Sequence, residues 1–179
     1  GIDFLSTGEI LVNGSSLAKM KENELAVYRA EEIGFIFQFY NLIPTLTVYE
    51  NVALMKDIKD DILDPIVILE RVGLKNHAKK FPNQLSGGEQ QRVSIARAIS
   101  KNPEILLCDE PTGALDSETG CKVLQLIQDV CREYQKTAII VTHNSNIAKV
   151  ADKVIRLRNG KIIDISVNES PAEIKDVEW

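Results

Sequence analysis

The stretch Glu104–Asp109 (EILLCD), followed by Glu110, decides how this chain folds. Its unbroken apolar run is typical of a strand that is buried on both faces of a parallel sheet. Thr137–Thr142 (TAIIVT) has the same character. Ile33–Gln38 (IGFIFQ) is rich in the aromatic and β-branched residues that favour strands. We therefore predict three strands, and expect the second and third to be buried.

The segments around these strands have helical and hairpin patterns. Ser117–Tyr134 places its apolar residues on one helical stripe. The other predicted helices are Lys21–Glu31, Ser86–Lys101, a short one at Asn144–Val150, and the charge-rich segment Asp57–Lys80 with helical spacing. Turn dipeptides indicate a short strand, Gly8–Asn13, closed by Asn13-Gly14, and a hairpin of Lys153–Arg158 with Lys161–Ser166. This alternation predicts the α/β class with a parallel sheet.

Composition narrows the functional classes. The 179 residues carry a net charge of −5 and are 44% apolar, which suits one globular domain that does not bind nucleic acid. No apolar run exceeds four residues, so we expect no membrane span, and no secretion signal opens the chain. The three cysteines form no CxxC pair, which argues for a reducing compartment. Because the first methionine is Met20, we expect a processed chain or a fragment.

Polar residues follow each of the three predicted strands. These are Gln38, the pair Asp109-Glu110, and His143. Ligands of parallel sheets bind outside the carboxyl ends of the strands, so these residues form a candidate site. Asp109 suits Mg²⁺, with Glu110 facing an attacking water. A surface turn is the alternative for the acidic pair, a structural hydrogen bond for His143, and an edge position without a task for Gln38.

The motif Leu85–Arg92 (LSGGEQQR) is a second candidate site. Ser86 is a good N-cap, and Gly87 and Gly88 allow a ligand close to the backbone. The helix that follows points free N–H groups at an anion. The alternative is an ordinary capped helix. Similarly, Asp116 can simply cap the helix beginning near Ser117, and His77 is interpreted as solvated surface.

In this order, the motifs resemble the nucleotide-binding domain of an ABC transporter. The resemblance matches Gln38 to the Q-loop, Leu85–Gln90 to the signature, Ile105–Glu110 to Walker B, Ala114–Asp116 to the D-loop and His143 to the switch histidine. It covers nearly the whole chain. It implies one domain, residues 1–179, with a P-loop-NTPase-like parallel sheet and a helical subdomain at about 45–101 that carries the signature. Two stretches, Phe35–Val52 and Pro111–Gly120, look most like the branch for lipoprotein release, macrolide export and antimicrobial-peptide resistance.

The resemblance implies an ATPase in which two domains, as a homodimer or heterodimer, sandwich two ATP molecules. A transmembrane permease subunit is the other partner, at the cytoplasmic face of the membrane. Asp109 and Gln38 would bind Mg²⁺, Glu110 would polarise water, and His143 would contact the γ-phosphate. The nucleotide contacts across the dimer would come from Ser86, Gly87, Gly88, Gln90 and Asp116.

One motif of the family is absent from the sequence. No Walker A loop, G-x-x-x-x-G-K-[ST], occurs, since Gly160-Lys161 is followed by Ile162 and Ile155 replaces the first glycine. Gly1–Ile10 resembles the stretch after the Walker A helix, so we expect the missing part before residue 1. The end, 177–179, resembles a natural C-terminus. We therefore expect the chain alone to be inactive, and its exposed apolar strands to promote self-association.

Two other functions are considered. A DNA-repair or chromosome-maintenance ATPase has a similar head, but here only 86 − 38 = 48 positions separate Gln38 from Ser86, without sustained heptads. The remaining alternative is a non-catalytic interaction or regulatory module derived from the ABC fold. The apolar stretch Gln38–Tyr49 is interpreted as the groove wall for a permease helix, with a core role as the alternative.

Overall fold

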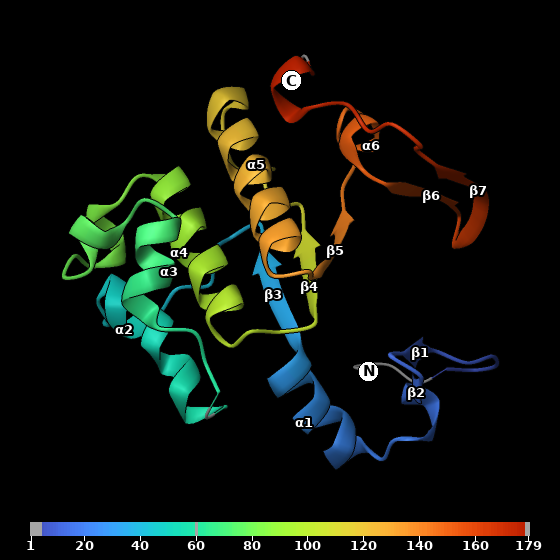
Figure 1. Ribbon diagram of the computed structural model, residues 1–179, viewed down its shortest axis with the longest axis horizontal. Helices are drawn as coiled ribbons and strands as arrows, with labels where there is room; N and C mark the ends of the chain where they lie inside the picture. The colour runs from blue at the N-terminus through green and yellow to red at the C-terminus, as the bar shows by residue number, and fades with distance from the viewer. Residues whose placement is uncertain (1–4, 60, 178–179) are drawn as a thin grey trace.

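The computed structural model describes residues 5–59 and 61–177. Its centre is a three-stranded parallel sheet of β3 (Ile33–Phe37), β4 (Ile105–Asp109) and β5 (Thr137–Val141), in that order (Figure 1). All three strands were predicted from their sequences. The expectations placed on residues 1–4, 60 and 178–179 lie outside the described residues.

Helices cover one face of this sheet. Figure 1 shows α5 (Ser117–Glu133) lying along the strands, with α4 (Gly87–Ser100) beside it. The residues that point to this face are buried, as Ile36, Leu106 and Cys108 show. At Gly34 a Cβ would lie 2.6 Å from Leu106 Cδ2 and 2.9 Å from a backbone oxygen of α4. Only glycine therefore lets α4 pack this closely on β3.

The opposite face of the sheet is open, which corrects the expectation that β5 is buried. Alternate residues of β5 are exposed, with Ile139 at 49% and Val141 at 62%. Phe35 and Phe37 stack on the same face with ring centroids 5.7 Å apart. Among the described residues β5 is an edge strand, and the pleat turns every second side chain away from α4 and α5. The apolar pattern alone predicts burial, whereas the lack of a Walker A motif predicts an exposed apolar strand, as found here. Self-association stays a prediction.

The charge-rich segment before α4 is less helical than its sequence suggested. The segment Asp57–Lys80 holds one α-helix, α3 (Pro65–Arg71), flanked by single 3₁₀ turns at Leu54–Asp57 and Lys75–His77. Proline at the first position and Gly73, with φ +72°, limit α3. A further helix, α2 (Val48–Ala53), was not predicted. It lies in contact with α3 and α4.

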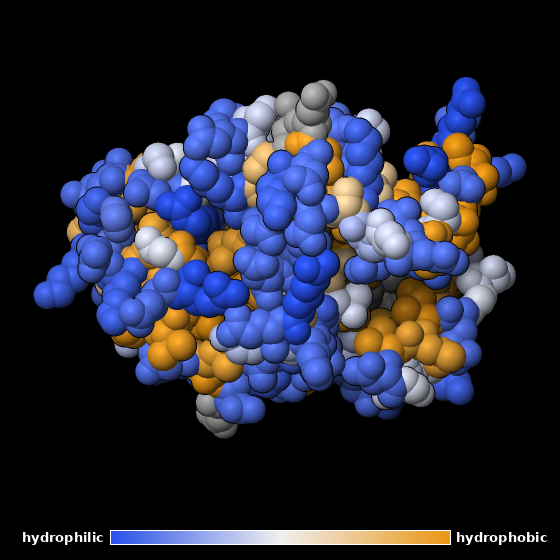
Figure 2. Space-filling view, turned by 45° about the horizontal axis from the view of Figure 1, so that its top comes forward, coloured by the Kyte–Doolittle hydropathy of each residue, from blue (hydrophilic) through white to orange (hydrophobic). Residues whose placement is uncertain are grey.

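Two small antiparallel hairpins stand apart from the parallel sheet. β1 (Leu11–Val12) and β2 (Ser15–Ser16) flank the predicted Asn13-Gly14 turn, although only two residues of the expected strand Gly8–Asn13 are extended. β6 (Lys153–Arg158) and β7 (Lys161–Val167) form the predicted C-terminal hairpin. Figure 2 shows apolar residues gathered on the side where Figure 1 places both hairpins. The remaining elements are α1 (Glu22–Glu32), α6 (Ile147–Val150) and 3₁₀ turns at Leu17–Lys19, Pro82–Gln84 and Ile174–Asp176.

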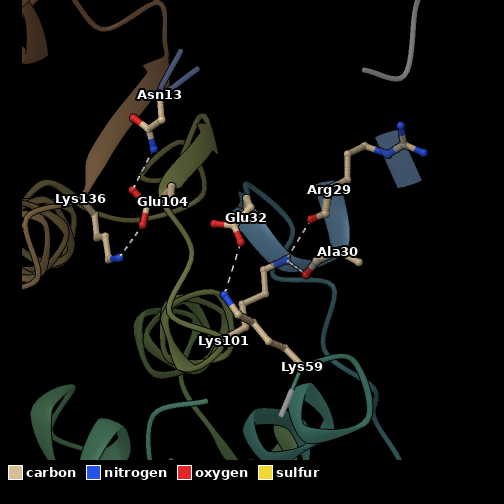
Figure 3. A network of polar contacts seen from close by, with 8 residues as sticks. All are labelled: Asn13, Arg29, Ala30, Glu32, Lys59, Lys101, Glu104 and Lys136. Carbon is tan, nitrogen blue, oxygen red and sulfur yellow. Dashed lines mark hydrogen bonds and ion pairs between the residues drawn. The ribbon is translucent and has the colours of Figure 1, made fainter. Parts of the chain in front are cut away.

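A polar network ties together the amino ends of the strands, away from the candidate site (Figure 3). The buried Lys101 donates to the backbone oxygens of Arg29 and Ala30 at 3.2 and 2.8 Å, at the end of α1. Glu104 accepts from Lys136 at 3.4 Å. Burial, with the nearby Lys59 charge, lowers the pKa of Lys101 to about 8, although Glu32 opposes the shift.

This pKa predicts how stability depends on pH. Between pH 8 and 10.5 the unfolded chain keeps the Lys101 proton that the folded chain releases, so folding is favoured as the pH rises. The free energy of unfolding of the wild type should therefore rise relative to Lys101→Met across this range, by at most about 1.4 kcal/mol per pH unit. Urea titrations at several pH values test it. Lys79→Met, which removes an exposed lysine, is the control. An equal rise in the stability of the wild type relative to Lys79→Met would contradict the prediction.

Candidate functional site

The parallel register brings the candidate residues to one edge of the sheet. Phe37, Asp109 and Val141 are paired across the three strands. Gln38 and Glu110 directly follow the first two, and His143 lies two residues beyond the third. Identical strand directions and matched ends explain why segments more than 30 residues apart meet here.

Glu110 is the most firmly held side chain of this edge. Its Oε1 accepts from the backbone N–H of His143 at 2.8 Å and lies 2.6 Å from His143 Nδ1. Its Oε2 accepts from the Thr142 hydroxyl at 3.0 Å. The Glu110 backbone is left-handed, with φ 45°, which is unusual for a residue with a side chain. Such a conformation persists where surrounding contacts fix it, as these do.

These contacts keep Glu110 ionised. Burial by itself would raise the pKa of the Glu110 carboxyl, but the hydrogen bonds from His143 and Thr142 outweigh it and lower the pKa overall. A carboxylate has about four acceptor positions on its two oxygens. Three are taken by the donors of His143 and Thr142, with Nδ1 assigned as a donor because it faces the carboxylate. About one position, on Oε2, is left for a water molecule.

Asp109 and Gln38 lie next to Glu110. The Asp109 side chain is exposed at the end of β4. Gln38 rests against Gly113, where a Cβ would be 2.9 Å from Gln38 Nε2 and 3.4 Å from Glu110 Cβ. Within residues 5–59 and 61–177, no three acidic, histidine or cysteine side chains cluster as a metal cage. An ion here would therefore depend on Asp109, an amide oxygen and ligands from substrate or water, the way Mg²⁺ is commonly held.

The Leu85–Gln90 motif begins α4. Ser86 Oγ accepts from the Glu89 N–H at 3.3 Å, and Glu89 Oε2 accepts from the Ser86 N–H at 2.7 Å, so the predicted N-cap is confirmed as a capping box. Gln90 Nε2 donates to the backbone oxygen of Leu85 at 3.2 Å and thus braces the loop before the helix. Asp116 caps α5 by accepting from the Thr119 N–H at 3.0 Å. Within this chain Asp116 therefore acts as a helix cap, which was the alternative interpretation of this residue.

Gly88 has a packing role that the sequence did not reveal. It is buried, and a Cβ there would lie 2.3 Å from Thr119 Cγ2 of α5. At Gly87 a Cβ would lie 2.8 Å from the Tyr40 hydroxyl. The two glycines thus let the starts of α4 and α5 meet and bring Tyr40 against the motif.

This contact gives a paired prediction. Gly88→Ala should lower the free energy of unfolding by about 2 kcal/mol, because overpacking outweighs the better helix propensity of alanine. Adding Thr119→Ser removes Cγ2, leaves the nearest Thr119 atom at 3.7 Å, and should restore most of the loss. Urea unfolding of both variants and of Thr119→Ser alone is the measurement. A Gly88→Ala protein as stable as the wild type would contradict the account.

Sequence reasoning missed three polar side chains that hold the loops of this site. They are Asn51 of α2, and Gln91 and Arg97 of α4, which all bind backbone groups of the segments after β3 and β4. Gln91 lies in the motif Leu85–Arg92 and Asn51 in the stretch Phe35–Val52, but neither pattern shows that these side chains bind backbone groups. Arg97 is one polar residue in a helix pattern. His77 was expected in solvent, but it is half-buried and its Nε2 lies 3.3 Å from Glu89 Oε1. The turn before it folds back onto the start of α4.

Known proteins resemble this chain in sequence and structure. The family model "ABC transporter" matches residues 4–113. The lipoprotein-releasing system ATP-binding protein LolD of Bacteroides fragilis is 41% identical over 167 residues, which is 90% of this chain and 77% of that protein. A Mycoplasma pneumoniae protein is 44% identical over 182 residues and aligns with 100% of this chain, which spans 39% of its length.

A solved structure is also similar to this chain. The ATP-binding cassette MJ0796, in a dimer described as a post-hydrolysis state bound to ADP and Pi, has a TM-score of 0.78 and 38% identity. The match covers 93% of this chain and 75% of that one.

Proposed function

The chain belongs to the ABC transporter family, and we propose that it is the ATP-binding and ATP-hydrolysing part of a transporter of the export or release type. The observation that carries the proposal is the Glu110 carboxylate, fixed by Thr142 and His143 beside Asp109 and Gln38. Its likeness to a lipoprotein-releasing ATP-binding protein supports the release type.

In this proposal Glu110 holds the attacking water. Its lowered pKa keeps the carboxylate ionised, and the acceptor position left on Oε2 receives one hydrogen of the water. The attack on a phosphoryl group needs mainly position and charge, so a carboxylate held by three donors is suited to it. Thr142 and His143 are then the residues that aim Glu110.

His143 contributes a second contact. Its side chain is 85% exposed, so the ring nitrogen that does not face Glu110 is open to a ligand. With Nδ1 facing Glu110, Nε2 is the ring nitrogen that would contact the γ-phosphate of ATP.

Asp109, with Gln38, would bind Mg²⁺ in this site. Mg²⁺ supplies positive charge against the phosphate oxygens. The exposed Asp109 carboxylate and the adjacent amide are the oxygen ligands that such an ion takes, one or two at a time.

A second ATP-binding domain completes the site in this proposal. Ser86, Gly87 and Gly88, with Gln90 bracing their loop, would contact ATP bound to the facing domain, and Asp116 would lie at the same interface. The solved relative is a dimer, which supports such a pairing. The net charge of −5 argues against nucleic acid as a partner.

ATP binding in this proposal also needs a Walker A loop, which these 179 residues do not contain. Backbone N–H groups and a lysine of that loop hold the β- and γ-phosphates. We infer that the chain alone binds ATP weakly. The open apolar face of β5 supports this view, because the expected Walker A helix would cover exposed strands such as this one.

The permease would dock on the segment after β3. Phe39 is 75% exposed and Ile43 is 37% exposed, which leaves apolar side chains for a partner helix. Tyr49 and Val48 pack inward, so the core alternative holds for the end of this segment. Among the described residues no helix has the length and hydropathy to cross a bilayer. With the permease docked there, we propose a peripheral location at the cytoplasmic face of the membrane.

The proposal is tested on the chain joined to a Walker A segment from a homologous ABC domain. Glu110→Gln should lower its rate of ATP hydrolysis by about a hundredfold, because the amide holds water poorly and loses its charge. Release of inorganic phosphate is measured. Glu118→Gln on α5, which changes an exposed carboxylate, should keep the rate. Equal rates for the parent and Glu110→Gln would remove Glu110 from the mechanism.

A further inference from the structure

Helix α4 forms hydrogen bonds to the segment that follows β3. Arg97 donates through Nη1 to the backbone oxygen of Asn41 at 2.6 Å and through Nη2 to that of Tyr40 at 3.0 Å. Both residues are left-handed, with φ 48° for Tyr40 and 50° for Asn41. Two such residues in succession are costly and need outside contacts to persist. The planar guanidinium fork supplies two contacts at once.

The charge of Arg97 has no acidic partner among the residues that the structure describes. No carboxylate of residues 5–59 or 61–177 lies within ion-pair distance of it. Burial lowers the pKa of Arg97 below its usual value, although a guanidinium stays protonated in proteins. What this half-buried charge binds is the backbone of one loop, so an ion pair does not explain its position.

Gln91, nearer the start of α4, reaches the ends of two strands. Its side chain is fully buried. Nε2 donates to the backbone oxygen of Pro111 at 2.8 Å and to that of Phe37 at 3.3 Å. These residues flank the site, since Phe37 precedes Gln38 and Pro111 follows Glu110. Gln91 therefore connects the backbones on both sides of the candidate chemistry.

The same loop also meets the beginning of α4. The Tyr40 hydroxyl lies where a Cβ of Gly87 would be, at 2.8 Å. The Tyr40 side chain thus reaches the start of α4, while the backbone oxygens of Tyr40 and Asn41 are bound by Arg97 near its end.

We propose that Arg97 and Gln91 are positioning residues that fasten the Gln38–Asn41 loop and the Glu110–Gly113 turn to helix α4, and so keep Gln38 and Glu110 in place at the edge of the sheet. Its functional meaning rests on the proposed function, in which Gln38 and Glu110 act on ATP.

Hydrogen–deuterium exchange of the whole chain without nucleotide tests the proposal. In Arg97→Ala, the amides of Phe39–Ile43 should exchange about tenfold faster, because hydrogen bonds from a charged donor are lost. A defined reporter is the Ile43 N–H, which donates to Asn51 Oδ1 at 2.8 Å. The amides of Ser86–Gln90 should also exchange faster, while those of β6 and β7 should not change. Arg97→Lys, which can reach one carbonyl, should give an intermediate effect.

Gln91 has its own reporter. The Gly113 N–H donates to the backbone oxygen of Glu110 at 3.0 Å. In Gln91→Met, which keeps the volume of the side chain, this amide should exchange a few times faster, as expected for the loss of neutral hydrogen bonds.

Arg92→Ala is the matched control, since Arg92 lies on α4 and its side chain donates no hydrogen bond among the described residues. Exchange that rises equally in Arg97→Ala and Arg92→Ala, or that rises uniformly over the chain, would overturn the proposal. If Arg97→Ala does not fold, exchange is compared between Arg97→Lys and the wild type. Unchanged exchange at Phe39–Ile43 in Arg97→Lys would then overturn the proposal. Failure of the chain joined to a Walker A segment to bind ATP would refute the proposed function and leave this result unaffected.

Discussion

Asn51→Leu is expected to lower the free energy of unfolding by about 4 kcal/mol. Asn51 is fully buried in α2. Its Oδ1 accepts from the Ile43 N–H at 2.8 Å, and its Nδ2 donates to the backbone oxygens of Ile43, Leu46 and Thr47 at 3.0–3.1 Å. Leucine has a similar volume but leaves the Ile43 N–H and the Leu46 oxygen without partners away from water, and each costs about 1–3 kcal/mol. The oxygens of Ile43 and Thr47 keep the backbone N–H donors of Leu46 and residue 51.

Urea unfolding measures this loss. Asn83→Leu is the control, because Asn83 is exposed and the change there should have little effect. Asn51→Asp keeps the acceptor for Ile43 but aims a charge at three carbonyl oxygens. It should be at least as unstable as Asn51→Leu at neutral pH and recover as the carboxyl takes up a proton at lower pH. If Asn51→Leu lowered the free energy of unfolding by less than about 1 kcal/mol, Asn51 would not be the residue that holds the loop 43–47.

The second large effect concerns ATP. Joining a Walker A segment to the chain should strengthen MgATP binding roughly a thousandfold, from millimolar or weaker to micromolar, which is about 4 kcal/mol. The residues of the described edge contribute one or two metal ligands and one ring nitrogen. The backbone N–H groups and lysine that bind the β- and γ-phosphates are in the missing loop.

The sequence predicted the parts of this fold that depend on local pattern. The strands Ile33–Phe37, Ile105–Asp109 and Thr137–Val141, and the helix Ser117–Glu133, follow from apolar runs and a single helical stripe. Because the ends of parallel strands meet at one edge of a sheet, the strand pattern was sufficient to predict that Glu110 and His143 lie close together.

The sequence could not predict what depends on distant contacts. Residues such as Asn51, Gln91 and Arg97 bind backbone groups, which are the same at every position, so no sequence pattern shows which loop each side chain reaches. Exposure of β5 was not predicted from its apolar pattern, because burial depends on which elements cover the strand. The charge-rich segment Asp57–Lys80 had helical spacing, but a proline and a glycine limited its helix to Pro65–Arg71.

Calorimetric titration with MgATP, on the chain alone and on the chain joined to a Walker A segment, tests the central claim most directly. The account predicts micromolar binding for the joined chain and none at micromolar concentrations for the chain alone. The joined chain with the lysine of its Walker A loop changed to alanine is the control, and it should bind weakly. If the chain alone bound MgATP at micromolar concentrations, the edge formed by Gln38, Asp109 and His143 would hold nucleotide by itself, and the proposed division of roles would be wrong.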